Sequence, residues 1–156
     1  LKLVTMFRQV PWIDEKILQN GLHEQTRNDE FTYGELFDKI IQDFQNAYDV
    51  LPKEQADGGR VHKVAGGAYL AKCYLTLAWG DGYEPTNGLN HINNEYMQKV
   101  VDYTDDVVNS KYNYAADYGD IFLPEHKNSE ESVFAVQCSD YQDDNKNSDV
   151  PTGPTC

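Results

Sequence analysis

Residues 64–79 constrain the fold more than any other part of the chain. They include one charged side chain, Lys72, and their apolar residues cover nearly every side of a helix with 3.6 residues per turn. Such a helix is stable only when other elements surround it, so this stretch predicts a central packing helix. Gly66 and Gly67 each cost about 1 kcal/mol of helix propensity relative to alanine. We therefore expect a neighbouring backbone to approach the helix closely at these two glycines.

Two amphipathic helices flank the central one. Thr32 and Glu35 form a T-x-x-E capping box at the start of the first, and Pro52 ends it. A short polar loop then makes the central helix antiparallel to the first. The predicted inner face of the first helix consists of Tyr33, Leu36, Phe37, Ile40, Ile41, Phe44, Ala47, Tyr48 and Leu51. That of the third consists of Met97, Val100, Val101, Thr104, Val107 and Val108.

The ends of the chain give weaker patterns. Residues 1–7 predict a helix with an apolar face, residues 14–30 a surface connection, and Trp12 between them a buried side chain. Residues 132–137 form the one predicted strand. Residues 111–123 predict an irregular segment that packs back on the helices through its apolar side chains, which are Tyr112, Tyr114, Tyr118, Phe122 and Leu123.

These elements predict a mainly α fold with little β. Two successive antiparallel helix pairs favour tetratricopeptide-like helical hairpins. The match is loose, because the helices are longer than that consensus and the step from Thr32 to Asn94 does not divide into units of about 34 residues. An ordinary helical bundle fits the same periodicity.

Composition narrows the classes of partner. The net charge of -13 is spread along the 156 residues, which disfavours nucleic acid and anionic membrane surfaces. No apolar run reaches the roughly 18 residues that span a bilayer.

Cys73, Cys138 and Cys156 are too far apart for a zinc or disulfide framework, and no cofactor is expected. The chain starts at Leu1 without a methionine, so we expect it to be part of a longer polypeptide.

Catalytic patterns are weak. Pairs of acidic residues such as Asp105 and Asp106 are adjacent in the chain and point in different directions, and no apolar frame would raise a carboxyl pKa. No G-x-S-x-G motif or phosphate-binding loop occurs. The histidines stand apart from one another, without the i, i+4 spacing of metal ligands; they are His23, His62, His91 and His126. The sequence therefore predicts a protein that is not an enzyme.

Sugar binding requires an exposed aromatic face with polar groups beside it. Two places have this composition. Trp79 precedes Asp81 and Tyr83 in a glycine-rich turn, and Asp140 and Tyr141 follow the predicted strand. At each place the structural alternative, that Trp79 closes the core and that Tyr141 has no such role, ranks ahead of sugar binding.

Four blocks of sequence, in this order and spacing, resemble the SusD/RagB family. The first is a helix ending in a Val10-Pro11 turn with acidic residues after it. The others are a helix before Leu51-Pro52, the stretch from Gly59 into the central helix, and a closing tyrosine-rich block. In residue numbers they are 3–15, 37–47, 59–75 and 112–137. The chain departs from the family in having His62 where Thr or Ser is frequent, and Gly66 and Gly67 where alanines are frequent.

The resemblance implies a SusD-like α-helical scaffold within a lipoprotein of the bacterial outer surface, anchored through an N-terminal segment outside these residues. Such proteins bind oligosaccharides without catalysis and deliver them to a SusC-like TonB-dependent transporter. A peptide cargo, or a protein adaptor without a small ligand, remains an alternative. The chain would be one fragment of such a domain, with a helical-hairpin core at about 31–110, an irregular segment and strand at 111–137 and a polar tail at 138–156.

Overall fold

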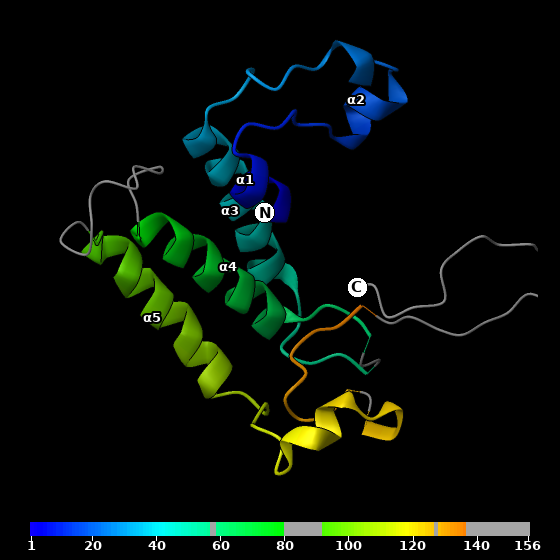
Figure 1. Cartoon of the computed structure of the whole chain (residues 1–156), viewed down its shortest axis with the longest axis vertical. Coiled ribbons are helices and arrows are strands. Elements are labelled where there is room, and N and C mark those ends of the chain that lie inside the picture. Colours follow the sequence, from blue (N-terminus) through cyan, green and yellow to red (C-terminus); the bar gives the residue numbers. More distant parts are fainter. Residues whose placement is uncertain (57–58, 80–91, 127, 137–156) are drawn as a thin grey trace, which may run out of the picture.

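The computed structural model describes residues 1–56, 59–79, 92–126 and 128–136. Three long helices form its centre: α3 (Tyr33–Val50), α4 (Lys63–Ala78) and α5 (Asn94–Val108), with α4 packed against both of the others (Figure 1). The shorter helices are α1 (Lys2–Phe7), α2 (Glu15–Gln19) and the 3-10 turns η1 (His23–Gln25), η3 (Tyr118–Phe122) and η4 (Pro124–His126). The described residues contain no strand. The predicted mainly α fold with little β is confirmed.

Helix α3 begins at the predicted capping box. The Glu35 N–H donates to Thr32 Oγ1 at 3.3 Å, and the Thr32 N–H donates to Glu35 Oε2 at 2.8 Å. The helix ends at Leu51, in an extended conformation before the proline. Its buried face forms a core with α1 and α4, made of Val4, Leu36, Phe37, Ile40 and Cys73.

The two glycines of α4 lie where α3 crosses it, as predicted. A Cβ atom on Gly66 would lie 3.4 Å from the Cα and N atoms of Tyr48. A Cβ atom on Gly67 would lie 3.2 Å from Cε2 of the same tyrosine. A side chain at Gly67 would press on the Tyr48 ring, and one larger than alanine at Gly66 would separate the helices, so the glycine pair permits this close packing.

Aromatic rings join α4 to α5. The ring of Tyr74 stacks on that of Tyr103, with 5.9 Å between centroids and 4° between planes. Tyr96 also contacts the Tyr74 ring, with 5.8 Å between centroids and 36° between planes. The prediction for the inner face of α5 was wrong at two positions, because Val101 and Val108 face solvent. At 100° per residue they lie roughly 120–160° around the helix from Tyr96 and Tyr103, the tyrosines that contact α4.

Helix α4 is not covered on every side, which corrects the prediction of a fully surrounded helix. Tyr69, Lys72, Leu75 and Trp79 follow one another at helical spacing and are exposed. The reason is geometric, since among the described residues α3 and α5 cover two sides of α4 and leave a third. An apolar face therefore remains open along the central helix.

The N-terminal part differs from expectation in two respects. Val4 of α1 is buried and Leu1 packs partly against the core, but Leu3 and Phe7 are exposed, so only part of the predicted apolar face packs. Residues 14–30, expected to be a plain connection, include α2, whose N-cap Asp14 accepts a hydrogen bond from the Ile17 N–H at 2.9 Å. Trp12 is half-buried against the core, in partial agreement with its predicted burial.

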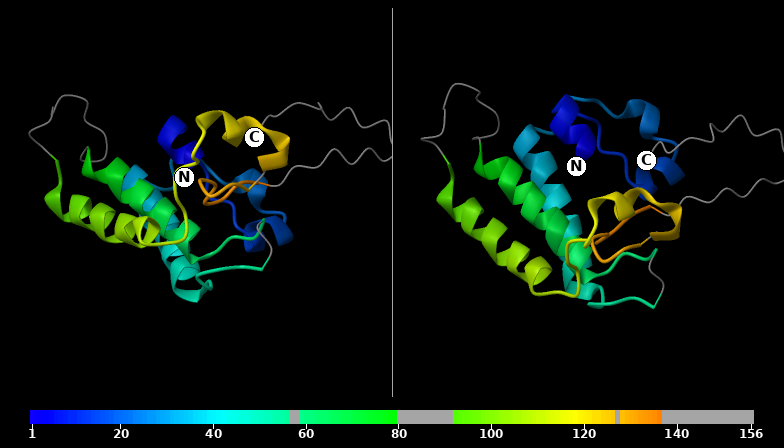
Figure 2. Two further views of the ribbon diagram at one scale, coloured as in Figure 1. Left: turned by 90° about the horizontal axis from the view of Figure 1, so that it is seen from below. Right: turned by 60° about the horizontal axis from the view of Figure 1, so that its bottom comes forward.

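The segments 110–112 and 132–136 lie beside the first turn of α4, where Tyr112 and Val133 contact His62 (Figure 2). The predicted strand is wrong over 132–136, because this extended segment has no partner strand among the described residues. The Ser132 N–H instead closes a turn by donating to the carbonyl of Ser129 at 3.0 Å. Gln137, the last residue of that prediction, lies outside the described residues.

Most of the side chains expected to return to the helices do not. Tyr112 is half-buried against His62, whereas Tyr114, Tyr118, Phe122 and Leu123 are exposed. Tyr118 and Phe122 contact each other within η3, with ring centroids 5.3 Å apart. The irregular segment is therefore attached to the helices through one aromatic residue.

Candidate functional site

Trp79 ends α4, and its N–H donates to the carbonyl of Leu75 at 3.3 Å. Its side chain is 55% exposed. The structure therefore contradicts the alternative that this tryptophan closes the core. The other four predicted site residues lie outside the described residues, so their relation to Trp79 stays a prediction; they are Asp81, Tyr83, Asp140 and Tyr141.

The exposed face of α4 extends the surface around Trp79. Leu75 lies one turn before it, and Tyr69 continues the face and stacks on Phe44 of α3 with 5.0 Å between centroids. Indole and phenol rings present flat apolar surfaces that pack against the C–H face of a sugar or against apolar side chains of a protein. This face of α4 could therefore bind either a sugar or an apolar protein surface.

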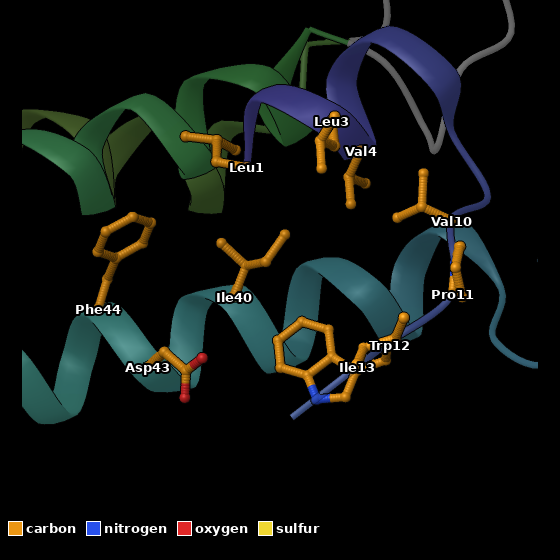
Figure 3. A pocket seen from close by; sticks show the side chains of 10 residues that line it. All are labelled: Leu1, Leu3, Val4, Val10, Pro11, Trp12, Ile13, Ile40, Asp43 and Phe44. Carbon is orange, nitrogen blue, oxygen red and sulfur yellow. The ribbon is translucent and has the colours of Figure 1, made fainter. Parts of the chain in front are cut away.

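An apolar cavity of about 370 Å³ lies between α1, the segment 10–13 and α3 (Figure 3). The side chains of α1 point across it towards Ile40, and Trp12 and Asp43 lie at its lower edge in the view. The Lys39 ammonium lies 5.4 Å from the centroid of the Trp12 ring, a cation–π distance. The sequence analysis predicts burial for Trp12 alone in this segment, and it does not reveal the cavity, whose walls come from segments separated in the chain.

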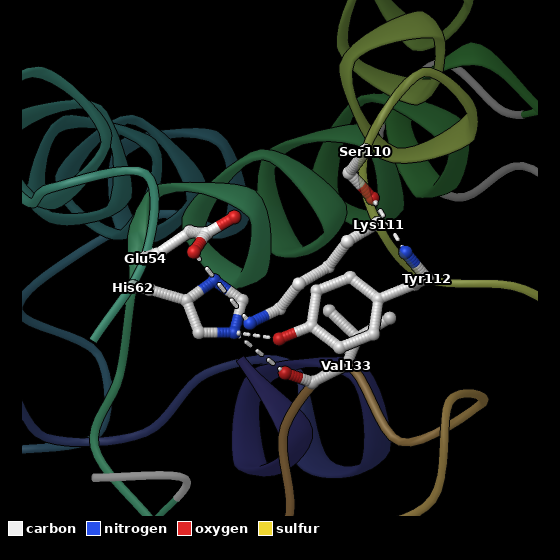
Figure 4. Close-up of polar contacts among 6 residues, drawn as sticks. All are labelled: Glu54, His62, Ser110, Lys111, Tyr112 and Val133. Atoms are coloured by element: carbon white, nitrogen blue, oxygen red, sulfur yellow. Dashed lines mark hydrogen bonds and ion pairs between the residues drawn. The ribbon is translucent and has the colours of Figure 1, made fainter. Parts of the chain in front are cut away.

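A smaller cavity, of about 250 Å³, has a polar lining with one aromatic ring. Figure 4 shows two of its residues, Lys111 and Tyr112, next to His62. The remaining lining residues come from one turn later in the chain and are Asn128, Ser129, Glu130 and Ser132. We call this space the Tyr112 cavity.

His62 fixes the ring of Tyr112. The imidazole is 6% exposed, and its Nε2 lies 2.6 Å from the Tyr112 hydroxyl and 2.9 Å from the carbonyl oxygen of Val133 (Figure 4). The two rings are 14° from parallel, with centroids 5.4 Å apart. His62 is the N-cap residue of α4, but its side chain makes no capping hydrogen bond. It connects three segments instead, a role that its isolation in the sequence did not indicate.

Three phenols and one thiol have raised pKa values, which stabilise their neutral forms. A hydrogen bond to Asp106, together with burial, raises the pKa of Tyr48 to about 12. Burial raises the pKa of the Cys73 thiol to about 11 and is the main cause that raises those of Tyr74 and Tyr103. These shifts leave no activated nucleophile or base near neutral pH among the groups concerned.

Two further observations concern the described part of the chain. No three His, Cys, Asp or Glu side chains gather there in a way that could hold a metal ion. None of its helices has the length and apolar character needed to cross a bilayer.

Comparison with known proteins finds a distant relative. No protein-family profile matches the chain. A Bacteroides ovatus protein described as "SusD-like protein" is 29% identical over 125 residues, which cover 80% of this chain and 21% of the relative. The chain thus spans about a fifth of the length of that relative. This distant and partial similarity points to the SusD family.

Proposed function

We propose that residues 1–156 are part of a SusD-like nutrient-binding protein that binds an oligosaccharide without catalysis. The supporting observation is the similarity to the SusD-like protein of Bacteroides ovatus over 80% of the chain. In this proposal the protein is lipid-anchored at the outer membrane, and a SusC-like TonB-dependent transporter receives the glycan. The helical hairpins at about 31–110 serve as its scaffold.

Trp79 supplies the physical basis for a glycan site. An exposed indole at a helix end can stack on the C–H face of a pyranose, and neighbouring carboxylates can accept hydrogen bonds from its hydroxyls. Asp81 and Tyr83 follow within four residues of the chain. Asp140 and Tyr141 are a second proposed place of the same composition.

A protein adaptor is the second candidate, because the exposed face of α4 is apolar. Tyr69, Leu75 and Trp79 together offer the kind of surface that protein partners cover. A peptide cargo is the third possibility and would use the same aromatic face. The three candidate functions predict different ligands, namely a glycan, a protein and a peptide. One set of titrations therefore distinguishes them.

The test is calorimetric titration of the full-length protein with starch, laminarin, xylan and mannan oligosaccharides, and with a mixture of oligopeptides. We expect one glycan to bind and Trp79→Ala or Tyr141→Ala to abolish binding without lowering the melting temperature. Tyr118→Ala is the matched control, since this ring is also exposed but belongs to η3. Binding of peptides alone, or of the transporter with no small ligand, would replace the glycan proposal.

A further inference from the structure

We propose that the Tyr112 cavity is a second carbohydrate subsite, which holds one neutral pyranose ring. This inference rests on the proposed function and adds a place and a ligand class to it. At about 250 Å³ the cavity is smaller than the roughly 300–1,000 Å³ typical of drug-sized ligands. One sugar ring suits this volume better than a longer stretch of glycan.

The lining matches the hydrogen-bonding needs of a sugar. The Lys111 ammonium donates, the Glu130 carboxylate accepts, and the hydroxyls of Ser129 and Ser132 can do either. Each sugar hydroxyl also donates and accepts, so a lining that offers both donors and acceptors beside one aromatic ring is complementary to it. The lining holds one positive charge, on Lys111, and one negative charge, on Glu130, and the carboxylates of Glu54 and Glu131 lie beside it. An anionic sugar is therefore disfavoured, and a neutral ring is the expected ligand.

The cavity walls are held in place by hydrogen bonds between segments far apart in the chain. The Asn113 N–H donates to the carbonyl of Glu130 at 3.1 Å, and the Ala115 N–H donates to a carboxylate oxygen of Glu131 at 3.2 Å. The buried imidazole of His62 holds the phenol of Tyr112 through the hydrogen bond between Nε2 and the phenol hydroxyl. A site fixed before the ligand arrives loses less conformational entropy on binding.

Lys111 is available to a ligand. Its ammonium lies 4.0 Å from the Glu54 carboxylate, at the limit of an ion pair, and both side chains are more than half exposed. Exposed pairs of this kind contribute little energy, so the ammonium can turn to a sugar hydroxyl at small cost. In Figure 4 the Lys111 side chain passes alongside the Tyr112 ring, which places the donor and the stacking surface together.

The test compares variants of the full-length protein in calorimetric titrations with the same neutral oligosaccharides and with pectin fragments that contain uronate. We expect Lys111→Ala and Glu130→Ala each to weaken binding of the neutral glycan about tenfold, the effect of losing one hydrogen bond to a charged group. Tyr114→Ala is the control, because this side chain is 84% exposed and does not line the cavity. The melting temperatures of all three variants should stay at the wild-type value.

A footprint gives a second readout that does not depend on a variant. Bound neutral glycan should slow acetylation of Lys111, whereas Lys16, which is exposed in α2, should react at an unchanged rate. If a glycan binds and Trp79→Ala weakens it, but Lys111 is neither needed nor protected, the subsite is refuted and the proposed function stands. If only the uronate fragments bind, the proposal of a neutral ligand is refuted. If no glycan binds, both the subsite and the proposed glycan-binding function are refuted.

Discussion

The crossing of α3 over α4 gives a sharp test of the packing, because the adjacent Gly66 and Gly67 face different parts of Tyr48, its backbone and its ring. A Cβ atom on Gly66 would lie 3.4 Å from the Cα and N atoms of Tyr48, which is an ordinary contact distance. A Cβ atom on Gly67 would lie 3.2 Å from Cε2 of the ring, which is tighter than side chains normally allow. Alanine therefore fits at the first position and requires the ring to move at the second.

The ring cannot move freely. Tyr103 packs edge-on against Tyr48 with 5.3 Å between centroids, and the Lys63 ammonium lies 4.2 Å from the centre of the Tyr48 ring. The Tyr48 hydroxyl also donates a hydrogen bond to Asp106. Displacing a side chain held at so many points costs about 1–3 kcal/mol, the usual range for overpacking.

Helix propensity opposes this cost. Replacing a helical glycine by alanine stabilises the folded state by about 1 kcal/mol. We therefore expect Gly66→Ala to raise the free energy of unfolding by about 1 kcal/mol. Gly67→Ala should lie between no change and a loss of about 2 kcal/mol, so that the two variants differ by about 1–3 kcal/mol.

Urea denaturation of the full-length protein, followed by circular dichroism, measures both free energies. Gly34→Ala in α3 is the reference for propensity alone, since a Cβ atom there would meet nothing within 4 Å. In a Tyr48→Ala background the clash disappears, and Gly67→Ala should become stabilising. If Gly67→Ala stabilises as much as Gly66→Ala in both backgrounds, the proposed contact does not limit the packing.

Three further predictions concern single groups. Thr32→Ala removes the capping box and should lower the free energy of unfolding by about 1 kcal/mol, measured as a fall in melting temperature; an unchanged melting temperature would contradict the cap. The pKa of Tyr48 is raised from 10.0 to about 12, so the stability it contributes below pH 10 should be lost as pH rises towards 12. Phenolate absorbance should follow this loss, and Asp106→Asn should move the transition to lower pH. In a variant that keeps Cys73 as its single thiol, burial and the raised pKa should make reaction with a thiol reagent slow until urea unfolds the chain, whereas fast native reaction would show an open core.

Local signals predicted the helices well. The capping box at Thr32 and Glu35 acts within one turn, and Pro52 ends a helix through its own geometry, so neither depends on distant residues. The glycine pair was also informative, because a loss of helix propensity in a buried helix calls for a packing reason. Periodicity, by contrast, assigned Val101 to the wrong face, since a wide apolar stripe does not show which of its edges meets a neighbour.

The parts that sequence reasoning missed depend on residues far apart in the chain. His62 and Val133 are 71 positions apart, and no local pattern indicates that the imidazole contacts that carbonyl. The wrong strand prediction at 132–136 has a similar origin. Apolar residues there fit an extended segment whether or not a second strand lies beside it, and in the structure the segment contacts His62 instead. At the candidate site, the sequence could select Trp79 as a ring beside a turn. The Tyr112 cavity could not be predicted, since its walls come from two segments that meet only in the folded chain.

The up-and-down order of α3, α4 and α5 has a consequence for how the chain reaches this structure. Each of these helices packs against the next one along the sequence, so most contacts between elements join consecutive helices. Chains with such local contacts cross a low entropic barrier and fold in microseconds to milliseconds. The contact of His62 with Val133 closes a much longer loop and should form last. During synthesis, the three helices can therefore assemble before residues 110–136 settle against them.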